Sequence, residues 1–141
     1  MSEPSAPSTS LTGGCLCGAL RYEARSPLYM GHCYCGDCRK ASGSGFIPFI
    51  GLKAKDVRIT GGVQRSTARA ANGNEAVRNH CARCASLVLG GPLDADDMIN
   101  IYAGSLDDAS LFVPTMAIFT RGKPDWALIP AGLKVFEGLP V

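Results

Sequence analysis

The sequence predicts a mainly β domain, and three observations support this fold class. Glycine and proline supply 17 and 9 of the 141 residues, well above average usage, which favours many turns and short elements. Candidate strands recur at close spacing along the chain, as is typical of all-β and mainly-β domains. Hydrophobic residues make up 46% and charged residues 18%, which is enough apolar material for a core. The length suits one domain.

The strand candidates are short runs rich in apolar and β-branched residues, bounded by turn signals. Because proline cannot donate to a ladder, Pro48 predicts an edge position or a bulge for the strand that contains it. Asn72-Gly73 lies between two candidates and is the strongest short hairpin signal. Short helical turns are expected after Cys38 and after Ser105. In chain order, the predicted strands cover residues 19–24, 46–52, 57–60, 64–70, 75–79, 86–89, 98–103 and 115–119.

Residues 1–12 are predicted to form a disordered tail, and residues 13–141 a single domain. The first ten residues are polar and rich in serine and proline, which is typical of a disordered end. They show neither a basic start nor an apolar stretch, so no secretory signal is expected and the protein is expected in the cytoplasm. No stretch approaches the roughly 20 apolar residues of a membrane span. The net charge of +2 gives no indication of nucleic-acid or membrane-surface binding.

Seven cysteines fall into three clusters that have the spacing of metal ligands. A reducing cytosol and an odd number of thiols both argue against a disulfide framework. Tetrahedral zinc needs four sulfurs about 2.3 Å from the metal, and so roughly 3.8 Å from one another. A Cys-x-x-Cys turn bends back to meet that need, and an extended Cys-x-Cys places both thiols on one face. The clusters are Cys15-Leu16-Cys17, Cys33-Tyr34-Cys35-Gly36-Asp37-Cys38 and Cys81-Ala82-Arg83-Cys84.

The cysteines divide naturally into two zinc sites. Cys15, Cys17, Cys81 and Cys84 together make a closed four-thiolate set, and closed sites are structural. This site would join the start of the chain to its middle and so replace core that a small domain lacks. The remaining triplet of Cys33, Cys35 and Cys38 offers three thiolates and an open position, which is the pattern of a catalytic zinc.

Other interpretations of the clusters stay open. His32 and His80 each directly precede a cysteine, and neighbours in an extended segment point to opposite faces, so a core or surface histidine is favoured over a ligand. Cys35 and Cys38 also have the spacing of a redox motif, but no thioredoxin-like βαβ pattern surrounds them. Four thiolates suit iron–sulfur clusters too, although the bacterial and plant spacings do not match.

At several places the chain resembles the glutathione-dependent formaldehyde-activating enzyme family, also called the centromere protein V family. The resemblance covers nearly everything from residue 13 onward, and all seven cysteines fall on the family's metal positions. The residues that carry it are Gly14-Cys15-Leu16-Cys17-Gly18-Ala19 with Arg21-Tyr22, the run 33–43, Cys81-Ala82-Arg83-Cys84, Ala103-Gly104-Ser105-Leu106-Asp107-Asp108, Pro124-Asp125-Trp126 and Phe136-Glu137-Gly138-Leu139-Pro140.

The resemblance implies a mainly β fold of several small antiparallel sheets around the zinc sites, similar to that of B-type methionine sulfoxide reductases. It implies a structural zinc on the four-cysteine set and a second, more labile zinc on the triplet. The implied activity is that of a carbon–sulfur lyase, which condenses glutathione with formaldehyde to S-hydroxymethylglutathione and reverses the step. The chain departs from the family in two places: Tyr34 replaces a usual histidine, and Ala85 replaces a usual glycine.

The expected chemistry places a thiol, with glutathione as the predicted partner, at the open position of the triplet zinc. A free thiol has a pKa near 8.5 and is a poor nucleophile at neutral pH, and a metal lowers that pKa. The zinc can instead polarise the aldehyde carbonyl, and the sequence leaves both routes open. The predicted catalytic residues are Cys33, Cys35, Cys38 and Arg39. Arg39 and Lys40 would offset the charge of the thiolates or bind a substrate carboxylate, and the alternative for each is a place on an exposed basic face.

Other residues carry weaker indications. Ser105 to Asp108 fits a capping box with Ser105 as N-cap, which is favoured over a catalytic pair formed by Asp107 and Asp108. Trp126 is expected to be partly buried core. Two function classes compete with the lyase: a non-catalytic zinc-binding interaction module, and a thiol oxidoreductase that uses the triplet.

Overall fold

The computed structural model describes residues 10–70, 73–94 and 96–140, and within these ranges the chain is built mainly from strands. One α-helix and four short 3-10 turns, at Ala54–Asp56, Ala103–Ser105, Ala109–Leu111 and Thr120–Gly122, accompany them. The elements are β1 Ser10–Gly14, β2 Arg21–Arg25, β3 Tyr29–Cys33, α1 Gly36–Ser42, β4 Ile47–Lys53, β5 Val57–Thr60, β6 Val63–Arg69, β7 Glu75–Cys81, β8 Leu87–Gly90, β9 Met98–Tyr102, β10 Met116–Ile118 and β11 Lys134–Val135.

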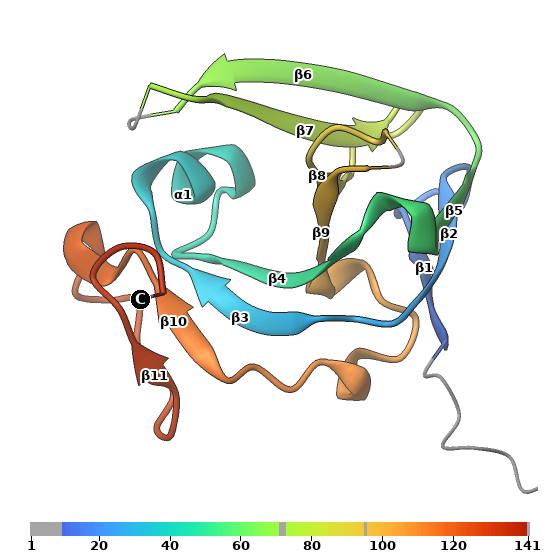
Figure 1. The fold of residues 1–141 in the computed structure, drawn as a ribbon. Helices are drawn as coiled ribbons and strands as arrows, with labels where there is room; N and C mark the ends of the chain where they lie inside the picture. The colour runs from blue at the N-terminus through green and yellow to red at the C-terminus, as the bar shows by residue number, and fades with distance from the viewer. Residues whose placement is uncertain (1–9, 71–72, 95, 141) are drawn as a thin grey trace, which may run out of the picture.

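The strands form two sheets, which confirms the predicted mainly β class. The smaller sheet has the order β1-β2-β5 and is antiparallel throughout. The larger has eight strands in the order β11-β10-β3-β4-β9-β8-β7-β6, and its β3–β10 and β10–β11 pairs are parallel. Figure 1 shows α1 between the β6–β7 hairpin and β4. The likeness to B-type methionine sulfoxide reductases stays a prediction.

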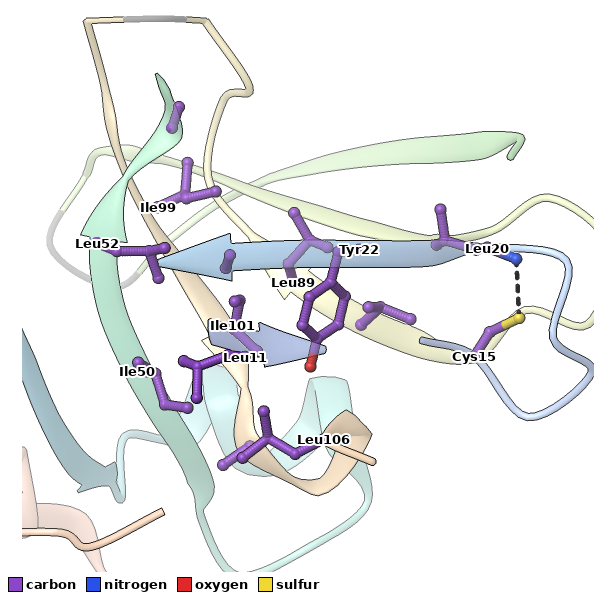
Figure 2. Close-up of a cluster of buried hydrophobic side chains, with 14 of the residues drawn as sticks. Leu11, Cys15, Leu20, Tyr22, Ile50, Leu52, Leu89, Ile99, Ile101 and Leu106 are labelled. Carbon is purple, nitrogen blue, oxygen red and sulfur yellow. Dashed lines mark hydrogen bonds between the residues drawn. The ribbon is translucent and has the colours of Figure 1, made fainter. Parts of the chain in front are cut away.

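The main core lies between the smaller sheet and one face of the larger one. Side chains alternate along a strand, so Ile50 and Leu52 of β4 point into this core, while Ile47, Phe49 and Gly51 lie on the opposite face. Figure 2 shows that β1, β2, β4, β8 and β9 all contribute to it. The second face of the eight-stranded sheet is therefore left for a site. The fully or almost fully buried members of the core include Leu11, Leu20, Ile50, Leu52, Val88, Leu89, Ile99 and Ile101.

The folded chain begins earlier than the predicted boundary at residue 13. Ser10, Leu11 and Thr12 belong to β1 and pair with β2, and Leu11 is fully buried. Its burial among core residues gives the physical reason that this segment is ordered. Residues 1–9 lie outside the described ranges.

The prediction that Pro48 marks an edge strand or a bulge is wrong. β4 lies inside the sheet between β3 and β9, and neither pairing shows a register shift. Pro48 is the second residue of β4, and pairing with β9 begins at Phe49. The missing N–H of the proline therefore falls beyond the β9 ladder.

The predicted hairpin between β6 and β7 is present with Arg69 opposite Glu75, although Asn72 itself lies outside the described residues.

Ser105 is not an N-cap, because it is the last residue of a 3-10 turn and its hydroxyl donates to the carbonyl of Tyr102. Asp108 is the cap instead, and its carboxylate accepts from the backbone N–H of Ser110. Asp107 does not take part in this cap and pairs with Arg21 instead.

Trp126, expected to be partly buried, is exposed and packs against Gly45. Among the described residues, no helix is long and apolar enough to cross a membrane.

Candidate metal centres

Four cysteines from two distant segments form the first cluster. The sulfurs of Cys15, Cys17, Cys81 and Cys84 all lie within 4.8 Å of one another. The Sγ–Sγ distance is 3.6 Å between Cys15 and Cys17, and 3.8 Å between Cys17 and Cys81. The cluster can hold a metal ion, and it joins the turn after β1 to the end of β7.

Backbone amides and a serine hold these thiols in place. The N–H of Leu20 donates to the sulfur of Cys15, as Figure 2 shows. The N–H groups of Arg83 and Cys84 both lie 3.3 Å from the sulfur of Cys81, a result of the tight turn after β7. N–H donors favour the thiolate form, which is the form that binds metals.

Ser86 joins the two halves of the first cluster. Its hydroxyl lies 3.1 Å from the sulfur of Cys84 and accepts from the backbone N–H of Leu16 at 3.1 Å. The hydrogen bonds from the side chain and the backbone of Ser86 lower the pKa of Cys84 to about 5. Ser86 thus supports the cluster, although the spacing of the cysteines does not indicate this residue.

Ala85 adopts a backbone conformation that explains the usual glycine at its position. Its φ is +65°, in the left-handed region that side chains disfavour, and its N–H closes the turn onto the carbonyl of Cys81. Alanine in place of glycine at this position therefore strains the backbone next to Cys84 of the first cluster.

The second cluster is local and contains three cysteines. Cys33 ends β3, Cys35 is the N-cap of α1, and Cys38 lies in the first turn of that helix. Their sulfurs also lie within 4.8 Å of one another, and those of Cys33 and Cys38 are 3.3 Å apart. The N–H of Cys38 donates to the sulfur of Cys35 at 3.2 Å. Hydrogen bonds from the thiols of Cys33 and Cys38 lower the pKa of Cys35 to about 2.

Neither histidine belongs to a cluster of possible ligands among the described residues. His32 is buried on the face opposite Cys33, where its ring stacks on Phe46 at 4.2 Å between centroids. Burial lowers the pKa of His32. His80 is half-buried in β7, opposite Gln64 of β6.

Tyr34 lies outside the three-thiol site, although it stands between two of the cysteines. It is fully buried in a separate cluster with Ala117 and Ala127. Its hydroxyl donates to the carbonyl of Leu128 at 2.9 Å and lies 3.3 Å from Nδ1 of His32. The alternation of the extended backbone turns its ring away from the thiols.

The three thiols of the second cluster open onto a cavity of about 890 Å³. The floor of this cavity is the face of the eight-stranded sheet opposite the main core. α1 lines it on one side and β7 on another, with the C-terminal segment also contributing. The floor residues include Cys33, Ile47, Phe49, Asn100, Tyr102 and Ile118.

Glycines beneath aromatic rings shape the floor. Phe49 pairs with Gly31 across β4 and β3, and a Cβ on Gly31 would come within 2.9 Å of its ring. Tyr29 lies over Gly51 in the same way, and the two rings pack edge-to-face at 6.0 Å. Because these glycines lack side chains, the rings can lie close to the sheet, which leaves the space above them open.

Arg78 is a cavity residue that the sequence analysis did not select. It lies on β7 opposite Gly90 of β8 and interacts electrostatically with Cys38 and Tyr102. Its Nε is buried and has no hydrogen-bond partner among the described residues. Side chains in the strand of residues 75–81 point alternately to its two faces, which places Arg78 on one of them. This pattern does not indicate which face lies towards the triplet.

The predicted catalytic residue Arg39 lies on α1, and its backbone N–H donates to the carbonyl of Cys35. Its Nε is buried without a hydrogen-bond partner among the described residues. Arg39 does not belong to the described lining of the cavity, and Lys40 next to it is exposed. Gly43 ends α1 in the left-handed conformation, with φ of +72°.

Comparison with known proteins gives concordant matches. The family model described as glutathione-dependent formaldehyde-activating enzyme matches residues 10–122. A curated protein of Halomonas elongata, named "Putative glutathione-dependent formaldehyde-activating enzyme", is 27% identical over 139 residues. That alignment covers 92% of this chain and 88% of the relative. The matched residues include both cysteine clusters.

Proposed function

Because the chain belongs to the glutathione-dependent formaldehyde-activating enzyme family, we propose that it is a zinc-dependent carbon–sulfur lyase acting on a thiol–aldehyde adduct. Glutathione is the proposed thiol, and S-hydroxymethylglutathione is the adduct that the family name suggests. One observation carries this proposal: the thiols of Cys33, Cys35 and Cys38 converge on the wall of a cavity large enough for a small molecule.

The first cluster fits a structural zinc. Sulfurs bound tetrahedrally at about 2.3 Å lie roughly 3.8 Å apart, and the 3.6 and 3.8 Å distances between its sulfurs agree with this. Cys15, Cys17, Cys81 and Cys84 would fill all four positions. The proposed role of this site is to stabilise the fold.

The donor set of the second cluster fits a zinc with a free coordination position. Three thiols supply the protein ligands, and they border the cavity instead of being enclosed by further ligand side chains. A zinc ion bound there would supply Lewis acidity and keep a substrate thiol deprotonated at neutral pH. No histidine is assigned to this site.

The protein residues around the triplet position and shield the reacting groups. The N–H of Cys38 fixes the sulfur of Cys35 by a hydrogen bond. Arg78 lines the same cavity and interacts electrostatically with Cys38. Its guanidinium is suited to bind a carboxylate of glutathione, because the planar fork matches a carboxylate in two hydrogen bonds. Arg39 stays a proposed catalytic residue that offsets the negative charge of the thiolates from the helix side.

The proposed reaction balances without an oxidant or a reductant. In the cleavage direction the adduct's C–S bond breaks, and sulfur leaves with the electron pair. The hydroxyl on the same carbon loses its proton as the C=O bond forms. The released thiolate takes up one proton in exchange for the one lost by the hydroxyl. One adduct therefore gives one thiol and one aldehyde. Condensation is the reverse.

A thiol oxidoreductase is the second candidate, because the sulfurs of Cys33 and Cys38 are only 3.3 Å apart. This candidate expects a reversible disulfide within the triplet under mild oxidation, with release of the metal. Protection of all three thiols from oxidation in the zinc-loaded protein would exclude it.

The lyase is tested by following exchange between formaldehyde, glutathione and their adduct by NMR at equilibrium. We expect the zinc-loaded protein to accelerate this exchange, and the Cys35→Ser variant to lose the acceleration while keeping its fold. Full acceleration by that variant would overturn the proposal.

A further inference from the structure

The cavity beside the triplet is larger and more apolar than formaldehyde requires. Its volume of about 890 Å³ lies near the upper end of the range of about 300–1,000 Å³ found for small-molecule pockets. Formaldehyde brings a single carbon to the reacting sulfur. Glutathione is strongly polar, with two carboxylates, an amine and two amides, so its own surface does not match an apolar wall.

The apolar part of the wall adjoins the triplet. Cys33 is directly opposite Ile47 on β4 and directly opposite Ile118 on β10. These two side chains lie on the same face as the thiol and line the cavity with it. Met116, two residues before Ile118 on β10, and the ring of Phe49 continue the surface. A carbon attached to a sulfur at the triplet would therefore meet hydrocarbon on the floor.

The polar part of the wall comes from β7 and β9 and also lies near the triplet, because Arg78 interacts electrostatically with Cys38. Arg78, Asn100 and Tyr102 line the cavity from β7 and β9, and Arg78 and Asn100 are both opposite Gly90 of β8. The guanidinium of Arg78 lines the cavity beside Tyr102, and its buried Nε has no hydrogen-bond partner among the described residues, so this arginine retains capacity to bind an anionic group. The lining from β3, β4 and β10 is thus apolar, whereas the lining from β7 and β9 is polar and contains both Arg78 and Glu75.

We propose that the adduct handled by this site carries an apolar group of several carbons on its aldehyde-derived carbon. This inference rests on the proposed lyase function and refines its substrate class. The alkyl or aryl group of the aldehyde packs on Ile47, Phe49 and Ile118, and a carboxylate of the thiol moiety binds Arg78. The reaction is that of the formaldehyde adduct with one hydrogen on carbon replaced by this group, so its balance is unchanged.

Binding of S-alkylglutathiones to the zinc-loaded protein tests the proposal without turnover. These thioethers stand in for the adduct, with the alkyl chain in place of the aldehyde-derived carbon. Burying one methylene is worth about 0.8 kcal/mol, which corresponds to roughly fourfold in affinity. Calorimetry with the methyl, butyl and hexyl compounds is therefore expected to show an increase of at least about tenfold from methyl to hexyl. An affinity that is flat or falls with chain length would overturn the proposal.

A matched pair of methionine variants locates the effect. Met116→Gln places a polar group of similar size on the floor, and it is expected to weaken hexyl binding about tenfold more than it weakens methyl binding. Met98→Gln alters an exposed methionine of β9 outside the described lining, and it is expected to change neither. Equal effects of both variants on hexyl binding would contradict the placement.

A second variant tests the same surface if Met116→Gln does not fold. Leu139 lines the cavity from the C-terminal segment and is 61% exposed, so Leu139→Ser should fold normally. It is expected to lower hexyl binding selectively. Leu128→Ser is its control, because that side chain is 77% exposed and outside the described lining.

Turnover assays separate failure of this inference from failure of the lyase. Glutathione adducts of formaldehyde, butanal and hexanal are compared by kcat/KM. Length-dependent binding with no turnover of any adduct would refute the lyase and retain the apolar subsite. Turnover of the formaldehyde adduct with length-independent binding would retain the lyase and refute the subsite.

Discussion

The sulfurs of Cys17 and Cys81 lie 3.8 Å apart although 64 residues separate them in the chain. Cys17 follows β1 in the smaller sheet and Cys81 ends β7 in the larger one, so this contact joins the two sheets. The triplet has a different character, because Cys33, Cys35 and Cys38 all lie on one short segment that runs from the last residue of β3 into the first turn of α1. The proposed roles agree with this difference: the cluster that joins the two sheets stabilises the fold, and the local triplet serves catalysis.

Cys81→Ser is expected to destabilise the protein strongly. Binding of structural zinc supplies about 10–16 kcal/mol in small zinc peptides, so losing one of four ligands removes several kcal/mol. We expect Tm to fall by at least about 10 °C. Differential scanning calorimetry with parallel metal analysis measures this. An unchanged Tm would show that the first cluster does not stabilise the fold.

Cys35→Ser is expected to act on activity and not on stability. The residue caps a helix of only seven residues at the edge of the cavity, so the fold should lose no more than about 2 kcal/mol. Metal content should fall by one ion while the metal of the first cluster is retained. A loss of stability as large as that of Cys81→Ser would contradict the assignment of separate roles.

Much of this division was available from the sequence, because ligand spacing is a local property. Cys-x-Cys and Cys-x-x-Cys each fix two sulfurs through a few backbone angles, so the pairs are local, and counting thiols was enough to predict that the two distant pairs form the set of four. The cavity did depend on it. Arg78 meets the triplet only because the β7–β8–β9–β4 register places it on the same face as Cys33, and no local pattern contains that information.

Two strands that were not predicted, β1 and β3, contain glycine for tertiary reasons. β1 contains Gly13, where a Cβ would come within 2.3 Å of both the Ser105 carbonyl and the Tyr22 hydroxyl. β3 contains Gly31, which lies beneath the ring of Phe49. Glycine at such places reflects the close approach of another group, whereas its intrinsic preference opposes strand formation.

Ala85→Gly is expected to stabilise the protein. Ala85 has φ of +65°, and a left-handed conformation costs an alanine about 1 kcal/mol more than a glycine. We expect Tm to rise by about 2–4 °C. Ala82→Gly in the same turn is the control, because Ala82 has no positive φ and should gain nothing. A lower Tm for Ala85→Gly would show that the turn is not strained.

Asp107→Asn is expected to lower stability at neutral pH and much less in acid. Two hydrogen bonds join Asp107 to Arg21, one of them 2.9 Å long, and Thr12 donates a third. These bonds, first that of Arg21, lower the folded-state pKa of Asp107 below its unfolded value of about 3.9. The stabilisation is therefore present above pH 4 and is lost as the pH falls through the folded pKa.

Urea unfolding of both proteins at a series of pH values checks this expectation. The difference in unfolding free energy should narrow as the pH approaches and passes below 4. A difference that stays constant or widens in acid would contradict the role of the Asp107 carboxylate.

Arg78→Met is expected to raise KM for the glutathione adduct by about tenfold to a hundredfold, since a hydrogen bond to a charged group contributes about 1.5–3 kcal/mol. Metal content should be unchanged. Arg65→Met on the exposed β6 strand is the matched control and should leave KM as it is. Steady-state kinetics with metal analysis distinguishes the outcomes, and an unchanged KM in Arg78→Met would remove the arginine from the binding site.

The proposed function requires that the protein holds two zinc ions and that only the one on Cys33, Cys35 and Cys38 has an open position. Native mass spectrometry with and without glutathione measures both properties in one experiment. We expect two zinc ions at rest, with one of them joined or removed by glutathione, and only one ion in the Cys35→Ser variant. Two ions indifferent to glutathione, or a single ion in the unmodified protein, would contradict the claim.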